Sequence, residues 1–192
     1  MLLLLAGLLI FLGMHSVSIF ALPLRDRLAA RNEYGWKAAY SVVSLIGMVM
    51  MIKGYGDFRQ VATVIYESPM WLRHVTFLLM LPVFILLISP YFPSRINQLI
   101  RNPQLTAIKL WAMAHLLVNG SVADILLFGG FMVWAVLDVI SVKRRPKRDV
   151  PHLPEFRSNM GIVIVVGLML YLLFAFWLHP MLIGVTILPT HG

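Results

Sequence analysis

Two histidines lie deep inside long apolar segments of this chain, and their imidazoles are the side chains best suited to chemistry. His15 lies within MLLLLAGLLIFLGMHSVSIFALPL, and His115 lies within LTAIKLWAMAHLLVNG. A polar side chain that can bind a ligand is costly in the hydrocarbon core, so its presence there indicates a functional site. Two imidazoles facing the interior of a helical bundle favour a metal, and in a membrane haem iron fits best. The residues therefore suggest His15 and His115 as ligands of a haem iron.

A structural role is the main alternative for both histidines. A membrane histidine often hydrogen-bonds to a neighbouring helix and then contributes about 1 kcal/mol to packing. For either His15 or His115 alone, this structural role is the favoured interpretation. Two histidines at interior depths bring the two interpretations to nearly equal weight, and spacing alone does not separate them.

His74, in WLRHVTF, competes with His15 as the partner of His115. At 1.5 Å per residue, His74 and His115 each lie about 6–9 Å from the outer ends of their helices, whereas His15 lies about 20 Å from Met1. Depth therefore favours a His74–His115 pair. The adjacent Arg73 instead favours a structural, substrate-facing or propionate-facing position for His74 near the interface. Three other histidines are expected at the surface: His152, His179 and His191.

The helix that carries His115 presents two more candidate side chains on the same face. Trp111, His115 and Asn119 follow one another at i, i+4 spacing. Asn119 or a backbone carbonyl can accept a hydrogen bond from the second ring nitrogen of His115, a contact that orients a ligating histidine. We therefore count Trp111 and Asn119 among the candidate cofactor-binding residues.

Three further polar residues lie near the ends of the His115 segment, roughly 104–120, and of the next apolar segment, roughly 122–142. Lys109 is expected to pair with Asp138 of the following helix, and its alternative role is to neutralise a haem propionate. Asp124 and Asn119, near the turn between the two helices, are expected to be capping groups.

The composition is that of an integral membrane protein. The chain has 192 residues, of which 60% are hydrophobic and 12% charged, and it contains no cysteine. Soluble domains carry about 25% charged residues. The absence of cysteine excludes disulfides, thiolate ligands and cysteine nucleophiles. The net charge of +8 lies in connecting loops, with no soluble module to present it, so nucleic acid is not an expected partner. Membrane lipid is.

Six segments are apolar and long enough to cross a bilayer, which predicts an all-α, polytopic bundle. The apolar N-terminal segment lacks a basic n-region and a cleavage site, so we expect it to be retained as the first span. No internal repeat or second domain is evident, and 1–192 is expected to form a single domain. The predicted spans are roughly 2–24, 37–53, 70–89, 104–120, 122–142 and 160–178.

The distribution of basic residues predicts the orientation of these spans. Placing both termini outside puts thirteen of the sixteen Lys and Arg residues on the cytoplasmic side, as the positive-inside rule requires. The run KRRPKRD is then a topology determinant first and a contact for anionic lipids second. The C-terminal MLIGVTILPTHG is too short to cross again and is expected at the outer interface. Only Lys53, Arg59 and Arg73 fall toward the outside.

Three stretches of the chain resemble the NnrU family of bacterial integral membrane proteins. These are YSVVSLIGMVMMIKGYG, WLRHVTFLLMLPVFILL and RNPQLTAIKLWAMAHLLVNGSVADILLFGGFMVWAVLDVISVKRR, together with the early pair His15-Ser16. The resemblance covers nearly the whole chain and implies a multi-pass protein of the bacterial inner membrane. The family is linked to denitrification, so nitrite and nitric oxide reductases are the partners that the resemblance implies.

The same family is related to ζ-carotene isomerase, which holds haem b between histidines in a membrane bundle. By motif, the histidine of the HS pair corresponds to His15, and the histidine of the AH pair corresponds to His115. The resemblance thus implies haem b with this axial pair and an apolar polyene as an alternative substrate. Related isomerases read RHPQ where this chain has Arg101-Asn102-Pro103-Gln104, which weakens the transfer of isomerase activity. If the chain is an enzyme, the resemblance implies an isomerase or a redox protein with unknown catalytic residues. A haem-free assembly or interaction protein remains the third alternative.

Overall fold

The computed structural model describes residues 1–146 and 152–185. In this part of the chain the backbone is almost entirely helical, and its only β pairing is an isolated bridge between Val64 and Ser121. The chain divides into two compact units. Unit 1 comprises residues 1–67 and 119–146, and unit 2 comprises residues 68–118 and 147–192. The expectation of a single domain remains a prediction.

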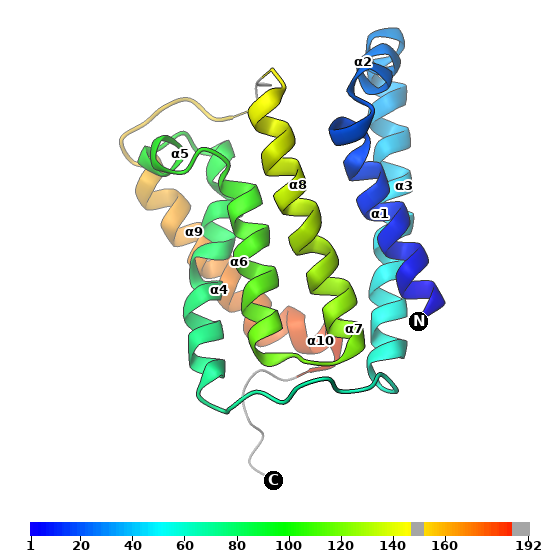
Figure 1. Cartoon of the computed structure of the whole chain (residues 1–192). Coiled ribbons are helices and arrows are strands. Elements are labelled where there is room, and N and C mark those ends of the chain that lie inside the picture. The colour runs from blue at the N-terminus through cyan, green and yellow to red at the C-terminus, as the bar shows by residue number, and fades with distance from the viewer. Residues whose placement is uncertain (147–151, 186–192) are drawn as a thin grey trace. The chain divides into compact units, whose positions relative to one another are not determined.

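Unit 1 is built on two long antiparallel helices joined by a short one (Figure 1). A third span then continues from an α-helical start through a π-helical turn. The elements are α1 (Leu2–Phe20), α2 (Leu22–Arg31), α3 (Glu33–Arg59), α7 (Val122–Asp124), the π-helical turn η2 (Ile125–Gly129) and α8 (Gly130–Arg144).

Unit 2 is built around α4, which packs against both α6 and α9. The elements are α4 (Leu72–Ile88), the 3₁₀ turn η1 (Ser89–Tyr91), α5 (Arg95–Leu99), α6 (Pro103–Val118), α9 (Asn159–Leu173), the π-helical turn η3 (Phe174–Leu178) and α10 (His179–Ile183).

Glycines bring α1 and α3 into backbone contact in unit 1. A Cβ atom added to Gly47 would lie 2.7 Å from the backbone nitrogen of Phe11, and one added to Gly7 or Gly54 would meet the backbone of the opposite helix just as closely. Small residues at a helix interface allow this approach in a membrane, where association depends on packing rather than on hydrophobic burial. The glycines therefore fix the register of α1 against α3.

Side-chain hydrogen bonds set the register of α4 against α6 in unit 2. The Thr76 hydroxyl donates to the carbonyl of Ala114 at 3.0 Å, and the Gln104 amide donates to the carbonyl of Leu87 at 3.2 Å. The first contact pairs the start of α4 with the end of α6, and the second pairs the end of α4 with the start of α6. The two helices are therefore antiparallel and remain in contact along their length. Val83, Leu86 and Ala107 form the buried core between them.

Five helical segments among the described residues are long and apolar enough to span a membrane: Leu2–Phe20, Glu33–Arg59, Leu72–Tyr91, Val122–Arg144 and Asn159–Ile183. The chain is thus an all-α, multi-pass membrane protein, as predicted. The sixth predicted span is the helix α6, whose 16 residues are about 24 Å long and fall short of the roughly 30 Å hydrocarbon core.

Three spans differ from the sequence-based expectation, and the last of them continues through His179 and Pro180 to Ile183 rather than ending near residue 178. The first span ends at Phe20 rather than near residue 24, because Ala21 leaves the helical conformation with φ −133° and ψ 44°. Pro23 then lies in the first turn of a new helix, where its missing N–H costs nothing. The result is α2, a helix in a segment that we expected to be a loop. The second span is longer than predicted at both ends, since polar residues of Glu33–Arg59 extend the helix beyond its apolar part.

Candidate functional site

His15 lies among aromatic side chains from three helices of unit 1. Its ring stacks on Phe11 of α1 with ring centroids 4.2 Å apart. The ring of Tyr40, from α3, lies 5.2 Å away, and that of Trp134, from α8, meets it edge-on at 5.9 Å. The indole Nε1 of Trp134 is buried and has no hydrogen-bond partner in the described structure. A buried donor without an acceptor is unusual and calls for an explanation, such as a bound group.

The hydrogen bonding of His15 determines which of its nitrogens can act as a ligand. Nδ1 lies 2.8 Å from the carbonyl oxygen of Phe11, one helical turn earlier. Because a carbonyl only accepts, Nδ1 must carry the proton, and in a neutral imidazole the lone pair is then on Nε2. A histidine that ligates a metal typically donates its other N–H to a carbonyl or carboxylate in this way.

His115 repeats this arrangement in unit 2. Its Nδ1 lies 2.9 Å from the carbonyl oxygen of Trp111, and the two rings are 5.4 Å apart. Of the two acceptors considered from the sequence, Asn119 and a backbone carbonyl, the structure uses the carbonyl for Nδ1. The carbonyl of Asn119 instead accepts from the Tyr66 hydroxyl at 2.9 Å. The structure therefore places Trp111 beside His115 and leaves Nε2 with the lone pair.

His74 lies at nearly the same level as His115 in unit 2. The Thr76–Ala114 hydrogen bond and a second one from the Ser68 hydroxyl to the carbonyl of Leu117 hold the start of α4 against the end of α6. In this register His74 lies within about one residue of His115 along the helix axes, or about 2 Å. The two histidines therefore lie at similar levels inside this unit, and which histidine pairs with His115 stays a prediction.

Comparison with known proteins identifies the family. The family model described as NnrU protein matches residues 3–187. The chain belongs to the NnrU family. Neither the curated proteins nor the solved structures gave a match.

The NnrU match runs through both structural units and includes every candidate ligand. Among the described residues, no three His, Asp or Glu side chains come together as a metal site. A haem held by two imidazoles does not need such a cluster. The geometry of each histidine by itself fits the group, because each has its lone pair on Nε2 and an aromatic ring beside it.

Asp138 of unit 1, for which Lys109 of unit 2 was the expected partner, has an ion-pair partner within its own unit in this NnrU-family chain. Asp138 pairs with Arg145 at 2.9 Å, and both side chains are mostly buried. Arg145 also donates to the carbonyl of Ser18 at 3.0 Å, which ties the end of α8 to the end of α1. Arg145, the C-cap residue of α8, lies two turns along the helix direction from Asp138, so the ion pair forms within one helix and its cap. Lys109 lies six residues before His115, about 9 Å along α6.

Replacing Arg145 with glutamine is expected to lower the free energy of unfolding by about 3 kcal/mol, because the Asp138 carboxylate loses its partner in a poorly solvated position. Denaturant titration of the protein in detergent micelles, followed by circular dichroism, measures this change. The exposed neighbour Arg144 provides the control, since Arg144→Gln breaks no ion pair in the described structure. Equal losses in the two variants would contradict the assignment.

Asp124 is the centre of a buried hydrogen-bond network in unit 1. Its Oδ1 accepts from the Tyr55 hydroxyl at 2.6 Å, and its Oδ2 accepts from the Ser121 hydroxyl at 2.6 Å and the Ser121 backbone N–H at 2.9 Å. Ser121 and Asp124 form a reciprocal capping box at the start of α7. The capping role expected for Asp124 is therefore confirmed. The link to Tyr55 of α3 was not predicted.

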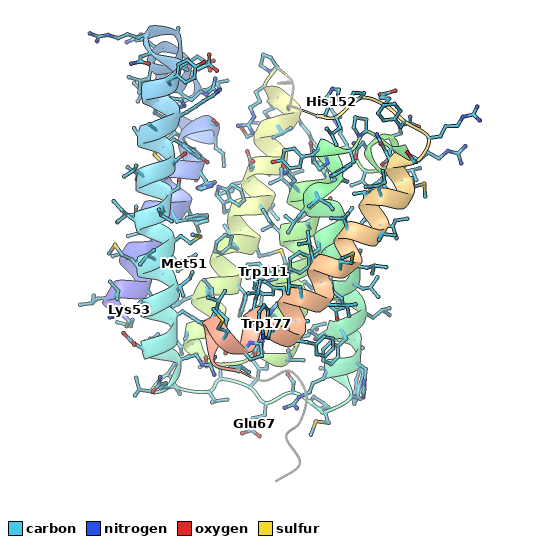
Figure 2. The ribbon with its side chains drawn as sticks, turned by 180° about the vertical axis from the view of Figure 1, so that it is seen from behind. Met51, Lys53, Glu67, Trp111, His152 and Trp177 are labelled. Carbon is cyan, nitrogen blue, oxygen red and sulfur yellow. The ribbon has the colours of Figure 1, made fainter. Side chains whose placement is uncertain are left out.

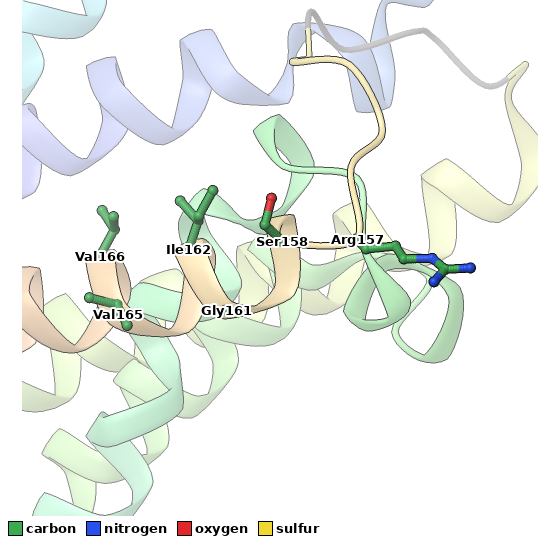
Figure 3. Close-up of a pocket in the computed structure, with 6 residues that line it drawn as sticks. All are labelled: Arg157, Ser158, Gly161, Ile162, Val165 and Val166. Carbon is green, nitrogen blue, oxygen red and sulfur yellow. The ribbon is translucent and has the colours of Figure 1, made fainter.

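A shallow cavity of about 570 Å³ lies at the start of α9, and none of the candidate ligands lines it (Figure 3). Its walls are almost entirely apolar. They are formed by Arg157, Ser158, Gly161, Ile162, Val165 and Val166.

Of the remaining histidines, His152 is exposed as expected, whereas His179 is half-buried and its Nδ1 lies 3.0 Å from the carbonyl of Val185. His191 lies outside the described residues.

Two residues beside His15 were missed from the sequence, Tyr40 and Trp134. Phe11 shares the face of His15 at i, i+4 spacing and is identifiable from a single helix. Tyr40 and Trp134 belong to other helices, and no periodicity within one helix states which residues of another lie at its level. Only the packing of α1 against α3 and α8 brings them together.

Proposed function

We propose that this NnrU-family protein binds haem b through His115 and His15 and serves nitrogen-oxide metabolism in the bacterial inner membrane, with both termini outside. The observation that carries the proposal is the shared state of the two imidazoles. In each, Nδ1–H donates to the carbonyl one turn earlier, so that the lone pair lies on Nε2, the atom that would bind iron. The link to denitrification and its reductases rests on membership of the family.

When bound between two imidazoles, haem b supplies a one-electron couple suited to electron transfer or redox sensing. The surrounding residues would determine how the group is held. Phe11, Tyr40 and Trp134 provide an aromatic wall at His15, and Trp111 provides one at His115. The unpartnered Trp134 N–H offers a hydrogen bond to an acceptor on the group.

A second ligand pair, His74 and His115, is favoured by the register of α4 against α6. His15 lies about 8 Å from the C-terminal end of α1, and His115 lies about 5 Å from the C-terminal end of α6. In the predicted topology these helix ends face opposite sides of the membrane. The depth argument therefore supports His74, and the family motif supports His15.

Absorption spectra of the detergent-purified protein, oxidised and then reduced with dithionite, test the proposal. We expect a stoichiometric low-spin haem b, identified by the pyridine haemochrome. His115→Ala should abolish stoichiometric haem and leave the helical circular dichroism unchanged. His15→Ala and His74→Ala then separate the two ligand pairs, because only the variant that lacks a ligand should lose the low-spin spectrum.

His152→Ala is the matched control, since His152 is exposed in a loop. It should retain full haem. Full haem in His115→Ala would contradict the role of His115. A protein that stays colourless when haem is supplied would favour a haem-free scaffold, in which the Nδ1 contacts serve only the helices that carry them.

A further inference from the structure

The basic end of unit 1 extends beyond the end of α1. The glycine contacts, with Gly47 against Phe11, set a register in which Phe20 at the end of α1 lies level with Ala38 of α3. The first five residues of α3 therefore continue about 7 Å past α1. The helix α2 packs beside this extension (Figure 1).

Aromatic residues in this extension indicate a position at the level of the lipid headgroups. Tyr34 is 84% exposed, and the ring of Trp36 lies 6.2 Å from that of Tyr40. Tyrosine and tryptophan concentrate at the boundary between hydrocarbon and water, where one part of the ring is apolar and the other is wet. A helix packed beside them lies in the same layer.

The outward face of α2 combines leucines with arginines. Leu24 and Leu28 are 51% and 39% exposed, and Arg27 and Arg31 are exposed beside them at i+3 spacing. No residue of α2 is buried. An interfacial helix has this composition, because its leucines reach the acyl chains while its arginines extend to the headgroups.

The charge at this end of the unit is strongly positive. Three acidic residues, Asp26, Glu33 and Asp138, form ion pairs with Arg25, Lys37 and Arg145. Four other basic side chains form no ion pair within the described residues. They are Arg27 and Arg31 of α2 and Lys143 and Arg144 at the end of α8.

We propose that the outward face of α2 and the basic end of α8 bind the headgroups of anionic phospholipids. The phosphate groups of such lipids complement the four basic side chains, and their acyl chains complement Leu24 and Leu28. Each basic residue near an anionic membrane surface strengthens binding about fivefold. A soluble phosphate compound would complement the arginines but would leave the two leucines in water. The surface includes none of the candidate haem ligands.

The absence of cysteine makes a clean test possible. Leu28→Cys gives one labelling site on the outward face, and a bimane label there reports contact with brominated acyl chains by quenching. The full-length labelled protein is reconstituted in vesicles of equal parts phosphatidylcholine and phosphatidylglycerol, with either one or the other brominated. We expect brominated phosphatidylglycerol to quench more strongly at the same mole fraction.

In the same labelled background, Arg27→Gln with Arg31→Gln should bring the two lipids to equal quenching. Lys53→Gln is the control, because Lys53 is an exposed basic residue near the opposite end of α3 and should leave the preference unchanged (Figure 2). Circular dichroism verifies that each variant is folded. The proposal is overturned by absence of quenching, by equal quenching in the parent, by an unchanged preference in the double variant, or by a preference that inorganic phosphate abolishes.

Discussion

Asp124→Ala is expected to destabilise the protein by about 3–5 kcal/mol, one of the two largest losses that we predict for a single residue. The substitution leaves three donors without an acceptor: the hydroxyls of Tyr55 and Ser121 and the backbone N–H of Ser121. An unsatisfied buried donor costs about 1–3 kcal/mol, and Asp124 is only 7% exposed. Denaturant titration in micelles, followed by circular dichroism, measures the change.

Asp57→Ala is the matched control, because Asp57 is an exposed carboxylate on α3 and should change the stability by less than about 0.5 kcal/mol. Tyr55→Phe removes the hydroxyl that donates to Asp124 and leaves the other hydrogen bonds of Asp124 in place. It is expected to cost about 1 kcal/mol. Combined with Asp124→Ala, it should add almost nothing, since its acceptor is already gone. Additive losses in the double variant would show that the Tyr55–Asp124 contact does not stabilise the fold.

Gly47→Leu is the second change with a large expected effect. Even the first side-chain carbon would lie 2.7 Å from the Phe11 nitrogen and 3.1 Å from its Cα. Backbone atoms cannot move aside as a flexible side chain can, so α1 and α3 must separate. Overpacking typically costs about 1–3 kcal/mol, and a clash with backbone belongs at or above the upper end of that range. We expect loss of the packed α1–α3 pair, measured as a lower unfolding midpoint.

Gly56 provides the control on the same helix. A Cβ at Gly56 meets nothing within 4 Å, so Gly56→Ala should be neutral or stabilising, since alanine is favoured over glycine in helices by about 1 kcal/mol. Gly47→Ala should destabilise despite the same gain in helix propensity. If the two alanine variants behave alike, the close approach of α1 and α3 does not govern stability.

The membrane spans were predictable from the sequence because a bilayer imposes a minimum length of apolar residues. The same reasoning overlooked α2, which has a mixed composition and is too short to span. It also placed the end of the first span too late, since Leu22 and Leu24 continue the apolar character past the break at Ala21. Hydropathy measures solubility in lipid and carries little information about backbone dihedral angles.

The candidate site was predictable only in its local part. Trp111 lies one turn before His115, and this spacing within one helix places it beside the candidate ligand. The pairing of Asp138 with Arg145 was not predicted, because opposite charges at similar depths of adjacent helices do not specify which pair forms. The Tyr55–Asp124 contact joins residues 69 apart and depends on how α3 and α7 meet.

The two structural units are interleaved along the chain, and this has a consequence for biogenesis. Unit 1 needs residues 119–146 to be complete, but α4 and α6 of unit 2 are synthesised first. As α3 enters the membrane, the Tyr55 hydroxyl precedes its acceptor by 69 residues of translation. During that interval the α1–α3 pair has only its own contacts, among them the close approach at the glycines and the His15–Tyr40 ring contact. We therefore expect the nascent α1–α3 hairpin to be less stable than the completed unit, because the buried Tyr55 hydroxyl has no Asp124 to donate to until residues 119–146 are added.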